Sequence, residues 1–172
     1  MARAKEKPLY SNPTDYEDDF YLWLYEQAEL LRLGRYDELD RPNLIEEIES
    51  LAREVRLRAE EHYRTLLFNL LRWEHRPQLR KRKWLVDIGN ARREIEYDER
   101  DSQSFRPDAR RFVAETYQQA REEAALWLDV RSTDLPDVCP YTLDQLRDHG
   151  WLPGPSEPNA LTLAPMRDPE ND

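Results

Sequence analysis

Residues 41–75 read RPNLIEEIESLAREVRLRAEEHYRTLLFNLLRWEH, with no glycine and, after Pro42, no proline. One side-chain stripe recurs every three or four positions, the spacing of a single helix face. It comprises Leu44, Ile45, Ile48, Leu51, Ala52, Val55, Ala59, His62, Tyr63, Leu66, Leu70 and Trp73. Asp40 is a candidate N-cap, and Pro42 would lie in the first turn, where its missing N–H costs little. The stretch predicts one helix of roughly 50 Å, which normally packs lengthwise on other helices or in a dimer.

The flanking sequence predicts further helices. A first helix is expected over residues 15–33, opened by a capping box from Thr14 to Glu17 and closed by Gly34. Pro77 ends the long helix and can begin the next, which runs to about residue 101. A fourth helix is expected over residues 104–128, with Ser104 as its cap. A second capping box, Thr142 to Gln145, opens a short helix that stops at Gly150.

Four main helices with short connections favour an all-α fold, an up-and-down bundle with one long helix and a short C-terminal helix. We expect one helical domain over residues 14–152. Residues 1–13 are expected to be a flexible tail. Residues 153–172 hold five prolines and few groups that could pack, so a disordered tail is expected there.

Composition limits the classes of function. The chain has 172 residues and 26 Lys or Arg against 36 Asp or Glu, for a net charge of −10, which disfavours coating of DNA or of anionic lipid. The single cysteine, Cys139, cannot form an internal disulfide, which suits a reducing compartment. No apolar run approaches the roughly 20 residues of a membrane span, and no signal peptide is visible. A cytoplasmic protein without membrane contact is expected.

Several short motifs, in a fixed order, resemble one known family. They are DYEDDFYLWLYEQAELL at 15–31, LD at 39–40, LIEEIESL at 44–51, LLRW at 70–73 with Pro77, Trp84 with Ile88 and Arg92, and CPYT at 139–142. This pattern resembles the family called domain of unknown function 29. The resemblance implies a small helical protein, largely bacterial, with no established activity. Two positions depart from the family: Asn69 replaces a frequent histidine, and Asp87 replaces a frequent threonine, so a role resting on that histidine does not carry over.

Known catalytic and metal-binding patterns are absent from the sequence. None of the three histidines follows a glutamate at the Glu-x-x-His spacing of di-metal bundles, and no HExxH motif occurs. There is also no phosphate-binding loop and no Ser/His/Asp set. We therefore assign no catalytic residue, no metal ligand and no cofactor, and an enzyme is not favoured. A metal-assisted hydrolase that uses His62 with carboxylates of other helices remains the least favoured alternative.

Two polar residues lie within the stripe of the long helix. His62 and Asn69 are seven residues apart and so share one helix face. A buried polar group without a hydrogen bond costs about 1–3 kcal/mol, so both need partners, for which Asp87, Arg92 or tyrosine hydroxyls are candidates. One interpretation is a network that fixes helix register. The other is a polar pocket formed by His62, Asn69, Asp87 and Arg92, with Arg92 binding an anion.

A cationic segment follows the long helix. Residues 72–93 hold eight Lys or Arg against two acids, and the sequence on either side is acidic. The candidate binding residues, called here the basic junction, are Arg72, Arg76, Arg80, Lys81, Arg82 and Lys83, with Trp73 and Trp84 nearby. The acidic helices could neutralise this segment by packing beside it. It could instead bind an acidic protein or, through cations next to aromatic rings, a nucleic acid.

Gly89 lies in the middle of a predicted helix, where glycine costs about 1 kcal/mol relative to alanine. We therefore expect a neighbouring backbone or a tryptophan ring to pack over it. Taken with the long helix and the many aromatic residues, the sequence favours a protein-interaction or adaptor module that binds a protein partner or forms a homo-oligomer. A nucleic-acid-associated protein that uses residues 76–83 is the runner-up.

Overall fold

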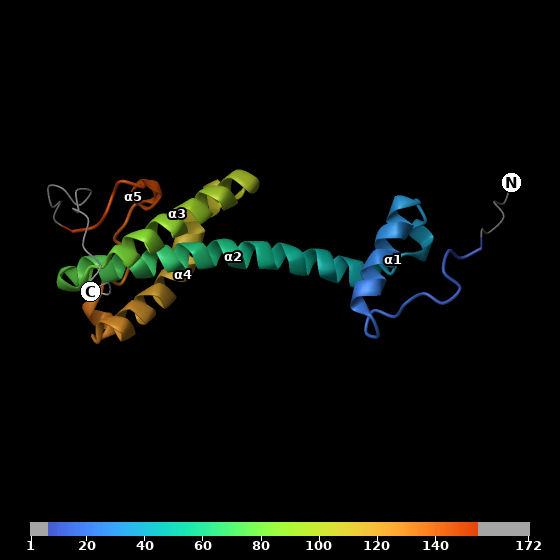
Figure 1. Cartoon of the computed structure of the whole chain (residues 1–172), viewed down its shortest axis with the longest axis horizontal. Helices are drawn as coiled ribbons and strands as arrows, with labels where there is room; N and C mark the ends of the chain where they lie inside the picture. The colour runs from blue at the N-terminus through green and yellow to red at the C-terminus, as the bar shows by residue number, and fades with distance from the viewer. Residues whose placement is uncertain (1–6, 155–172) are drawn as a thin grey trace, which may run out of the picture. The chain divides into compact units, whose positions relative to one another are not determined.

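A computed structural model describes residues 7–154, and within these residues every regular element is helical (Figure 1). The α-helices are α1 (Phe20–Arg32), α2 (Arg41–His75), α3 (Arg82–Asp101), α4 (Phe105–Leu128) and α5 (Leu143–Arg147). Three single turns of 3₁₀-helix, η1 (Tyr36–Glu38), η2 (Pro77–Leu79) and η3 (Ser132–Asp134), lie between them. This confirms the predicted all-α class and its bundle-like packing of helices. No helix in this part of the chain is long and apolar enough to cross a membrane.

The chain divides into two compact units, Met1–Val55 and Arg56–Asp172. Unit 1 holds α1, η1 and the first part of α2, and unit 2 holds the rest of α2 with the later elements. The single domain expected over residues 14–152 stays a prediction, and each unit is described by itself below. Of the two expected tails, residues 1–6 and 155–172 lie outside the described residues. Within the first tail, the backbone N–H of Leu9 donates to the Glu38 carboxylate at 2.8 Å.

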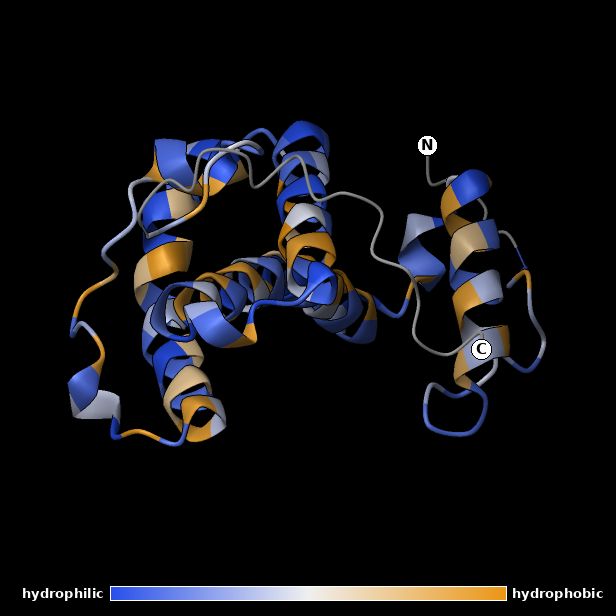
Figure 2. Cartoon of the chain, turned by 60° about the vertical axis from the view of Figure 1, so that its left-hand side comes forward, coloured by the Kyte–Doolittle hydropathy of each residue, from blue (hydrophilic) through white to orange (hydrophobic). Residues whose placement is uncertain are grey.

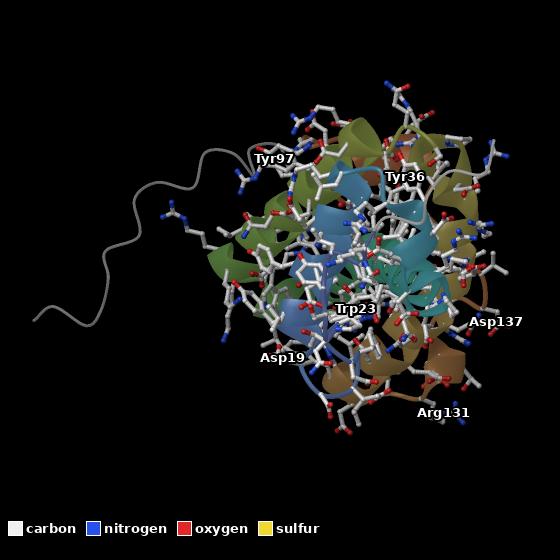
Figure 3. The ribbon with its side chains drawn as sticks, turned by 90° about the vertical axis from the view of Figure 1, so that its right-hand side faces the viewer. Asp19, Trp23, Tyr36, Tyr97, Arg131 and Asp137 are labelled. Carbon is white, nitrogen blue, oxygen red and sulfur yellow. The ribbon has the colours of Figure 1, made fainter. Side chains whose placement is uncertain are left out.

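The first helix begins later than expected, and its predicted cap is wrong. Asp19 is the N-cap of α1 (Figure 3). Its carboxylate accepts from the Leu22 N–H at 2.9 Å. Thr14 instead donates its N–H and its hydroxyl to the Glu26 carboxylate, at 2.8 and 2.9 Å. Thr14 thus binds a residue twelve positions along the chain instead of capping the helix. The chain makes one more turn before α1 starts. Gly34 follows the helix with φ of +72°, as its predicted terminating role requires.

Unit 1 is held together by a buried tryptophan and by polar contacts at the start of α2. Trp23 of α1 is 1% exposed, and its indole N–H donates to the Asp40 carboxylate at 3.3 Å. The Gln27 side-chain oxygen accepts from the Asp40 N–H at 2.9 Å. Asp40 also accepts from the backbone N–H of Asn43 at 3.4 Å, which agrees with its predicted place at the start of the helix.

Unit 2 has a continuous apolar core. The second half of α2 contributes four leucines with 0% exposure, and α3, α4 and α5 pack around them (Figure 1). These leucines are Leu66, Leu67, Leu70 and Leu71. The Thr142–Gln145 capping box is present at α5, as predicted. Pro77 begins η2 rather than α3, so that predicted helix start is wrong. Ser104 is the N-cap residue of α4, as predicted, although its side chain makes no capping hydrogen bond.

The structure overturns the expectation for Gly89. Nothing lies within 4 Å of the position that a Cβ would take there, so no backbone or ring packs over it. Gly89→Ala is therefore expected to raise the free energy of unfolding by about 1 kcal/mol, because alanine has the higher helix propensity and restricts the unfolded chain. Urea denaturation followed by circular dichroism measures this change.

Gly34→Ala is the matched control for that substitution. It also has open space, but its φ of +72° disfavours alanine, so we expect a loss of about 1 kcal/mol. A loss of stability in Gly89→Ala would contradict the open surroundings of residue 89.

Candidate functional site

A polar pocket of about 430 Å³ lies between α2 and α3, entirely within unit 2, and is called here the α2–α3 pocket. Six α2 residues line it, and four of them, His62, Thr65, Asn69 and Arg72, follow spacings of three and four, which places these four on one helix face. Its lining comprises His62, Arg64, Thr65, Phe68, Asn69 and Arg72 from α2, Lys83, Asp87, Asn90, Ala91 and Glu94 from α3, and Glu123 from α4. The pocket therefore combines charges of both signs with a partly apolar wall.

Three of the four residues proposed for a polar pocket, His62, Asn69 and Asp87, line this pocket. Arg92 lies elsewhere. Its guanidinium is buried and donates to the carbonyl oxygens of Leu146 at 2.9 Å and Gln145 at 3.1 Å, near the end of α5. Burial lowers the pKa of Arg92. This arginine therefore ties α5 to α3 and does not line the α2–α3 pocket, so the expected grouping of all four residues in one pocket is not found.

His62 has a partner that sequence reasoning missed. Its Nδ1 lies 2.7 Å from the carboxylate of Asp98, which is 8% exposed. The Arg58 guanidinium approaches the same carboxylate at 3.7 Å. Asp98 continues the buried face of α3, three residues after Ile95, and a charge at such a position was the available signal. Asp87 is instead bound by Lys83 at 2.9 Å.

Asn69 satisfies only part of its hydrogen-bonding capacity. Its side-chain N–H donates to the Thr65 carbonyl at 2.8 Å, one turn earlier in α2. Its Oδ1 is buried and accepts no hydrogen bond in the described residues, although the residue is only 3% exposed. The bond to Thr65 sets the orientation of the amide, because the reverse orientation would place two oxygens together. Asn69 thus leaves one acceptor unused at the pocket wall.

Arg72, a candidate binding residue of the basic junction, is buried among aromatic rings. Its guanidinium carbon lies 4.6 Å from the ring centre of Phe68, 4.4 Å from that of Trp84 and 4.5 Å from that of Trp127. The residue is 9% exposed, and burial lowers its pKa. Three helices therefore supply an aromatic cage for one cation. Arg72 faces the α2–α3 pocket rather than the outer surface.

Other members of the basic junction bind backbone rather than presenting free charge. Arg76 donates to the Leu128 carbonyl at 2.5 Å, and Arg80 donates to the Trp73 carbonyl at 3.0 Å while stacking on the Trp73 ring. Both carbonyls lie at helix C-termini, where cations are favourable. Lys81 and Arg82 are exposed. The junction is thus neutralised mainly by carbonyls and rings, which leaves a smaller cationic surface than its composition suggested.

The described residues also define what chemistry the pocket could support. Within residues 7–154, no three His, Cys, Asp or Glu side chains are grouped so that they could hold a metal ion. The His62–Asp98 pair has the geometry of a base and its orienting carboxylate. The pocket wall adds the hydroxyl of Thr65, the amine of Lys83 and several carboxylates to this pair.

A second feature, in unit 1, is an exposed apolar stripe on the first part of α2. It comprises the exposed Ile45, Ile48, Leu51 and Ala52 with the half-buried Leu44 and Val55, and is called here the exposed stripe. Ile45, Ile48 and Leu51 are 57, 66 and 61% exposed, although the same periodic stripe is buried further along α2. The expected packing of this part of the helix, lengthwise on other helices or in a dimer, stays a prediction.

Helix α1 adds further apolar surface to unit 1. Only four of its residues are buried, and large hydrophobic side chains are exposed on successive turns. Figure 2 shows hydrophobic residues spaced along the ribbon of this helix. They are Phe20, Tyr21, Leu22, Leu24, Tyr25 and Leu31. A helix that is hydrophobic around its circumference is normally covered, so this exposure indicates a surface made for contact.

Comparison with known proteins places the chain in one family. The model of the family described as Domain of unknown function DUF29 matches residues 16–152, in agreement with the motifs identified above. No curated protein and no solved structure shows a significant match. Because the match covers most of the chain, this protein belongs to the family described as domain of unknown function DUF29.

Proposed function

We propose that the protein is an interaction module without catalytic activity, whose exposed stripe binds an amphipathic helix of a partner protein. The single observation behind this proposal is the exposure of Ile45, Ile48 and Leu51 on one face of α2. Burying three such side chains contributes several kcal/mol to an association, since each is worth about 1.5–3 kcal/mol. Residues 44–55 form about three helical turns, which is long enough for a second helix to pack against them.

The charges beside the exposed stripe select the kind of partner. By helical position, Glu47 and Glu54 flank the stripe on one side and Glu49 flanks it on the other. Glu47 accepts from the Tyr16 hydroxyl at 2.5 Å and stays an anion, while Arg53 lies 3.9 Å from Glu49. A partner helix with lysine or arginine at its edges complements these carboxylates. A second copy of the chain would bring like charges together, so a homo-oligomer through this stripe is the less favoured occupant.

A pair of synthetic helices tests this proposal directly. One peptide of about 18 residues carries a leucine face with lysine edges, and the other carries the same face with glutamate edges. We expect the purified protein to bind the lysine peptide at least about tenfold more tightly than the glutamate peptide or a scrambled lysine peptide. Isothermal titration calorimetry at physiological salt measures the three affinities.

Variants locate the binding surface. The double substitution Ile48→Ser and Leu51→Ser is expected to weaken binding of the lysine peptide by about tenfold or more. Leu57→Ser is the matched control, because Leu57 lies on α2 with the same 61% exposure as Leu51 but outside the stripe. Equal binding by the double variant and the wild type would overturn the proposal. Light scattering tests the other occupant. If the wild type is a dimer and the double variant is a monomer, a second copy of the chain, rather than a partner helix, binds the exposed stripe.

A further inference from the structure

A second pocket, of about 980 Å³, lies in unit 2 where α3, α4 and α5 come together, and is called here the α3–α5 pocket. Arginine outnumbers acid in its wall, although the chain as a whole has a net charge of −10. Besides His149, the charged lining consists of Arg92, Arg100, Arg106 and Arg147 with Glu96 and Glu99. A cationic pocket in an acidic protein favours an anionic ligand.

The two glutamates of the α3–α5 pocket already have partners. Glu99 binds the Arg147 guanidinium at 2.6 Å and accepts from the Tyr63 hydroxyl at 2.9 Å. Glu96 lies 3.7 Å from Nε2 of His149, and its side chain is 72% exposed. In the described part of the chain, neither glutamate forms an ion pair with the other three arginines. The pocket thus keeps three guanidinium groups without a carboxylate from its own wall.

Two of these three arginines, Arg100 and Arg106, are exposed. The guanidinium of Arg106 forms neither an ion pair nor a hydrogen bond within residues 7–154. Nε of Arg100 lies 3.6 Å from the adjacent Asp101, and its guanidinium carbon lies 4.5 Å from the ring centre of Tyr97. An exposed pair of this kind contributes little, so most N–H donors of both arginines remain available to a ligand.

Arg92 supplies a donor from the buried wall of the α3–α5 pocket. The residue is 3% exposed, and its Nε and Nη2 donate to the carbonyls of Leu146 and Gln145. Its Nη1 forms no hydrogen bond among the described residues and is not fully buried. Asp148 acts on this guanidinium through space without forming an ion pair with it, and its Oδ1 accepts from the Gly150 N–H at 2.8 Å. Arg92 therefore has one donor group left for a ligand.

The lining indicates which anion fits. Guanidinium groups bind carboxylate and phosphate oxygens in pairs. A phosphate monoester carries about two negative charges near neutral pH and has three strong acceptor oxygens, so it satisfies several arginines at once. Ile95, Pro107 and Leu146 add an apolar part to the wall, and the volume exceeds that of a single ion. Arginines beside an apolar wall favour a phosphate that is attached to an organic group.

We propose that the α3–α5 pocket binds a small organic molecule that carries a phosphate group. The phosphate accepts from Arg100, Arg106 and Nη1 of Arg92, and the organic group lies against the apolar part of the wall. The pocket volume is within the range of small-molecule sites. This site lies in unit 2 and is independent of the exposed stripe and its partner.

Three probes test the pocket by nuclear magnetic resonance at about pH 7.5, where a phosphate monoester is a dianion. Phenyl phosphate offers the phosphate and an apolar ring, inorganic phosphate lacks the ring, and benzenesulfonate keeps the ring but has one negative charge. We expect phenyl phosphate to shift the backbone amide signals of residues 100–106 and 146–149 saturably, with a dissociation constant below about 1 mM. The other two probes should each bind about fivefold or more weakly.

Two substitutions separate this pocket from a general effect of charge. Arg106→Gln should weaken binding of phenyl phosphate by about fivefold or more. Arg82→Gln is the matched control, because Arg82 is also exposed and its loss changes the net charge equally. Arg82 lies 18 residues before Arg100 on α3, roughly 27 Å along the helix, so Arg82→Gln should change the affinity by less than about twofold.

Each outcome decides the proposal. Absence of saturable shifts with phenyl phosphate overturns it, as does equal weakening by Arg106→Gln and Arg82→Gln. Equal affinities for benzenesulfonate and phenyl phosphate overturn the assignment of a phosphate, and equal affinities for inorganic phosphate and phenyl phosphate overturn the organic group. Glu96→Gln removes a nearby negative charge, so about twofold tighter binding of phenyl phosphate supports the site and weaker binding contradicts it.

Discussion

Replacing Phe112 by alanine is expected to lower the free energy of unfolding of the protein by about 3–5 kcal/mol, the usual cost of removing a phenylalanine from a packed core. Phe112 of α4 has 0% exposure, and its ring packs edge-on against Phe105 at 5.3 Å and tilted against Tyr63 at 6.0 Å. The ring is shared by helices α2 and α4, so the cavity would weaken both.

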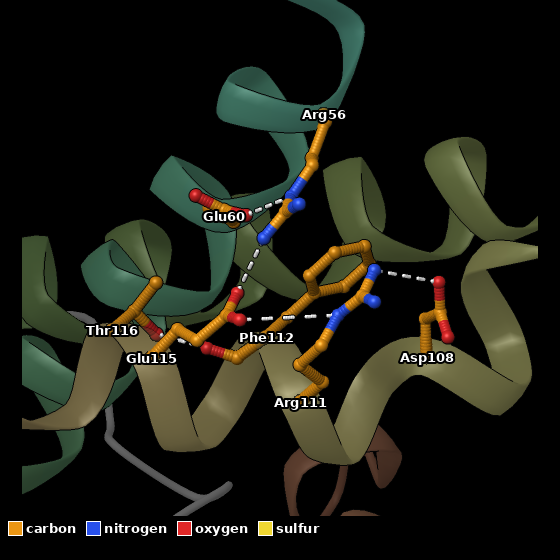
Figure 4. Close-up of polar contacts among 7 residues, drawn as sticks. All are labelled: Arg56, Glu60, Asp108, Arg111, Phe112, Glu115 and Thr116. Atoms are coloured by element: carbon orange, nitrogen blue, oxygen red, sulfur yellow. Dashed lines mark hydrogen bonds and ion pairs between the residues drawn. The ribbon is translucent and has the colours of Figure 1, made fainter. Parts of the chain in front are cut away.

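One charged side chain beside Phe112 contacts its ring: the Arg111 guanidinium carbon lies 5.9 Å from the ring centre (Figure 4). The expected loss therefore includes this half-exposed cation–π contact in addition to packing. Arg56 binds Glu60 at 2.6 Å and Glu115 at 2.7 Å, while Thr116 donates to the Phe112 carbonyl at 2.7 Å. None of these bonds uses the phenyl group.

Urea denaturation followed by far-ultraviolet circular dichroism measures this loss. Leu126→Ala is the control on the same helix, because Leu126 is 85% exposed and its truncation should change stability by no more than about 0.5 kcal/mol. A loss below about 1 kcal/mol for Phe112→Ala would show that the ring does not hold the unit 2 core together.

The second large effect is a loss of stability in alkaline solution. Tyr63, Tyr117 and Tyr141 are all buried in unit 2, and their hydroxyls donate to Glu99, to the Pro136 carbonyl and to Glu74. Burial is the largest cause that raises the pKa of each hydroxyl. For Tyr63 and Tyr141, the nearby carboxylate raises the pKa further.

The direction in which stability changes with pH follows from the raised pKa values. The pKa of Tyr117 rises from 10.0 to about 12 in the folded protein. Below pH 10 both states keep the proton, so its contribution is fully present there. Between pH 10 and 12 the unfolded chain loses the proton while the folded chain retains it, so stability falls as pH rises. Two pKa units correspond to about 2–3 kcal/mol for this residue.

Urea unfolding at a series of pH values from 8 upward measures the alkaline loss. Tyr117→Phe should reduce the steepness of the fall above pH 10, whatever its effect at neutral pH. Tyr36→Phe, at a residue that is 58% exposed, is the control and should leave the steepness unchanged. The same slope in Tyr117→Phe and in the wild type would contradict a raised pKa for Tyr117.

Helix α2 was predicted with its observed bounds, because its periodic residues and its cap are local features. The shared face of His62 and Asn69 followed from their spacing, and both line the α2–α3 pocket. The cap of α1 was missed because Thr14 has a competing partner twelve residues away in Glu26. Local pattern rules do not include such competition.

The contacts of the basic junction were not predicted from the sequence, for a different physical reason. Counting charges predicted a cationic surface, but a count contains no information on side-chain direction. Arg72 is buried against rings from α3 and α4, and Arg76 reaches a carbonyl 52 residues away. The Asp98 partner of His62 is 36 residues distant. These contacts depend on how helices pack together, which single-helix periodicity does not specify.

Three of the arginines join parts of unit 2 that are distant in the chain. Arg76 reaches Leu128, Arg92 reaches Leu146 and Arg121 reaches Leu135, each by a hydrogen bond to a backbone oxygen. They act as non-covalent cross-links, the role that cystine bridges play in secreted domains. Because no sulfur takes part, a reducing agent that would open a cystine leaves these cross-links closed.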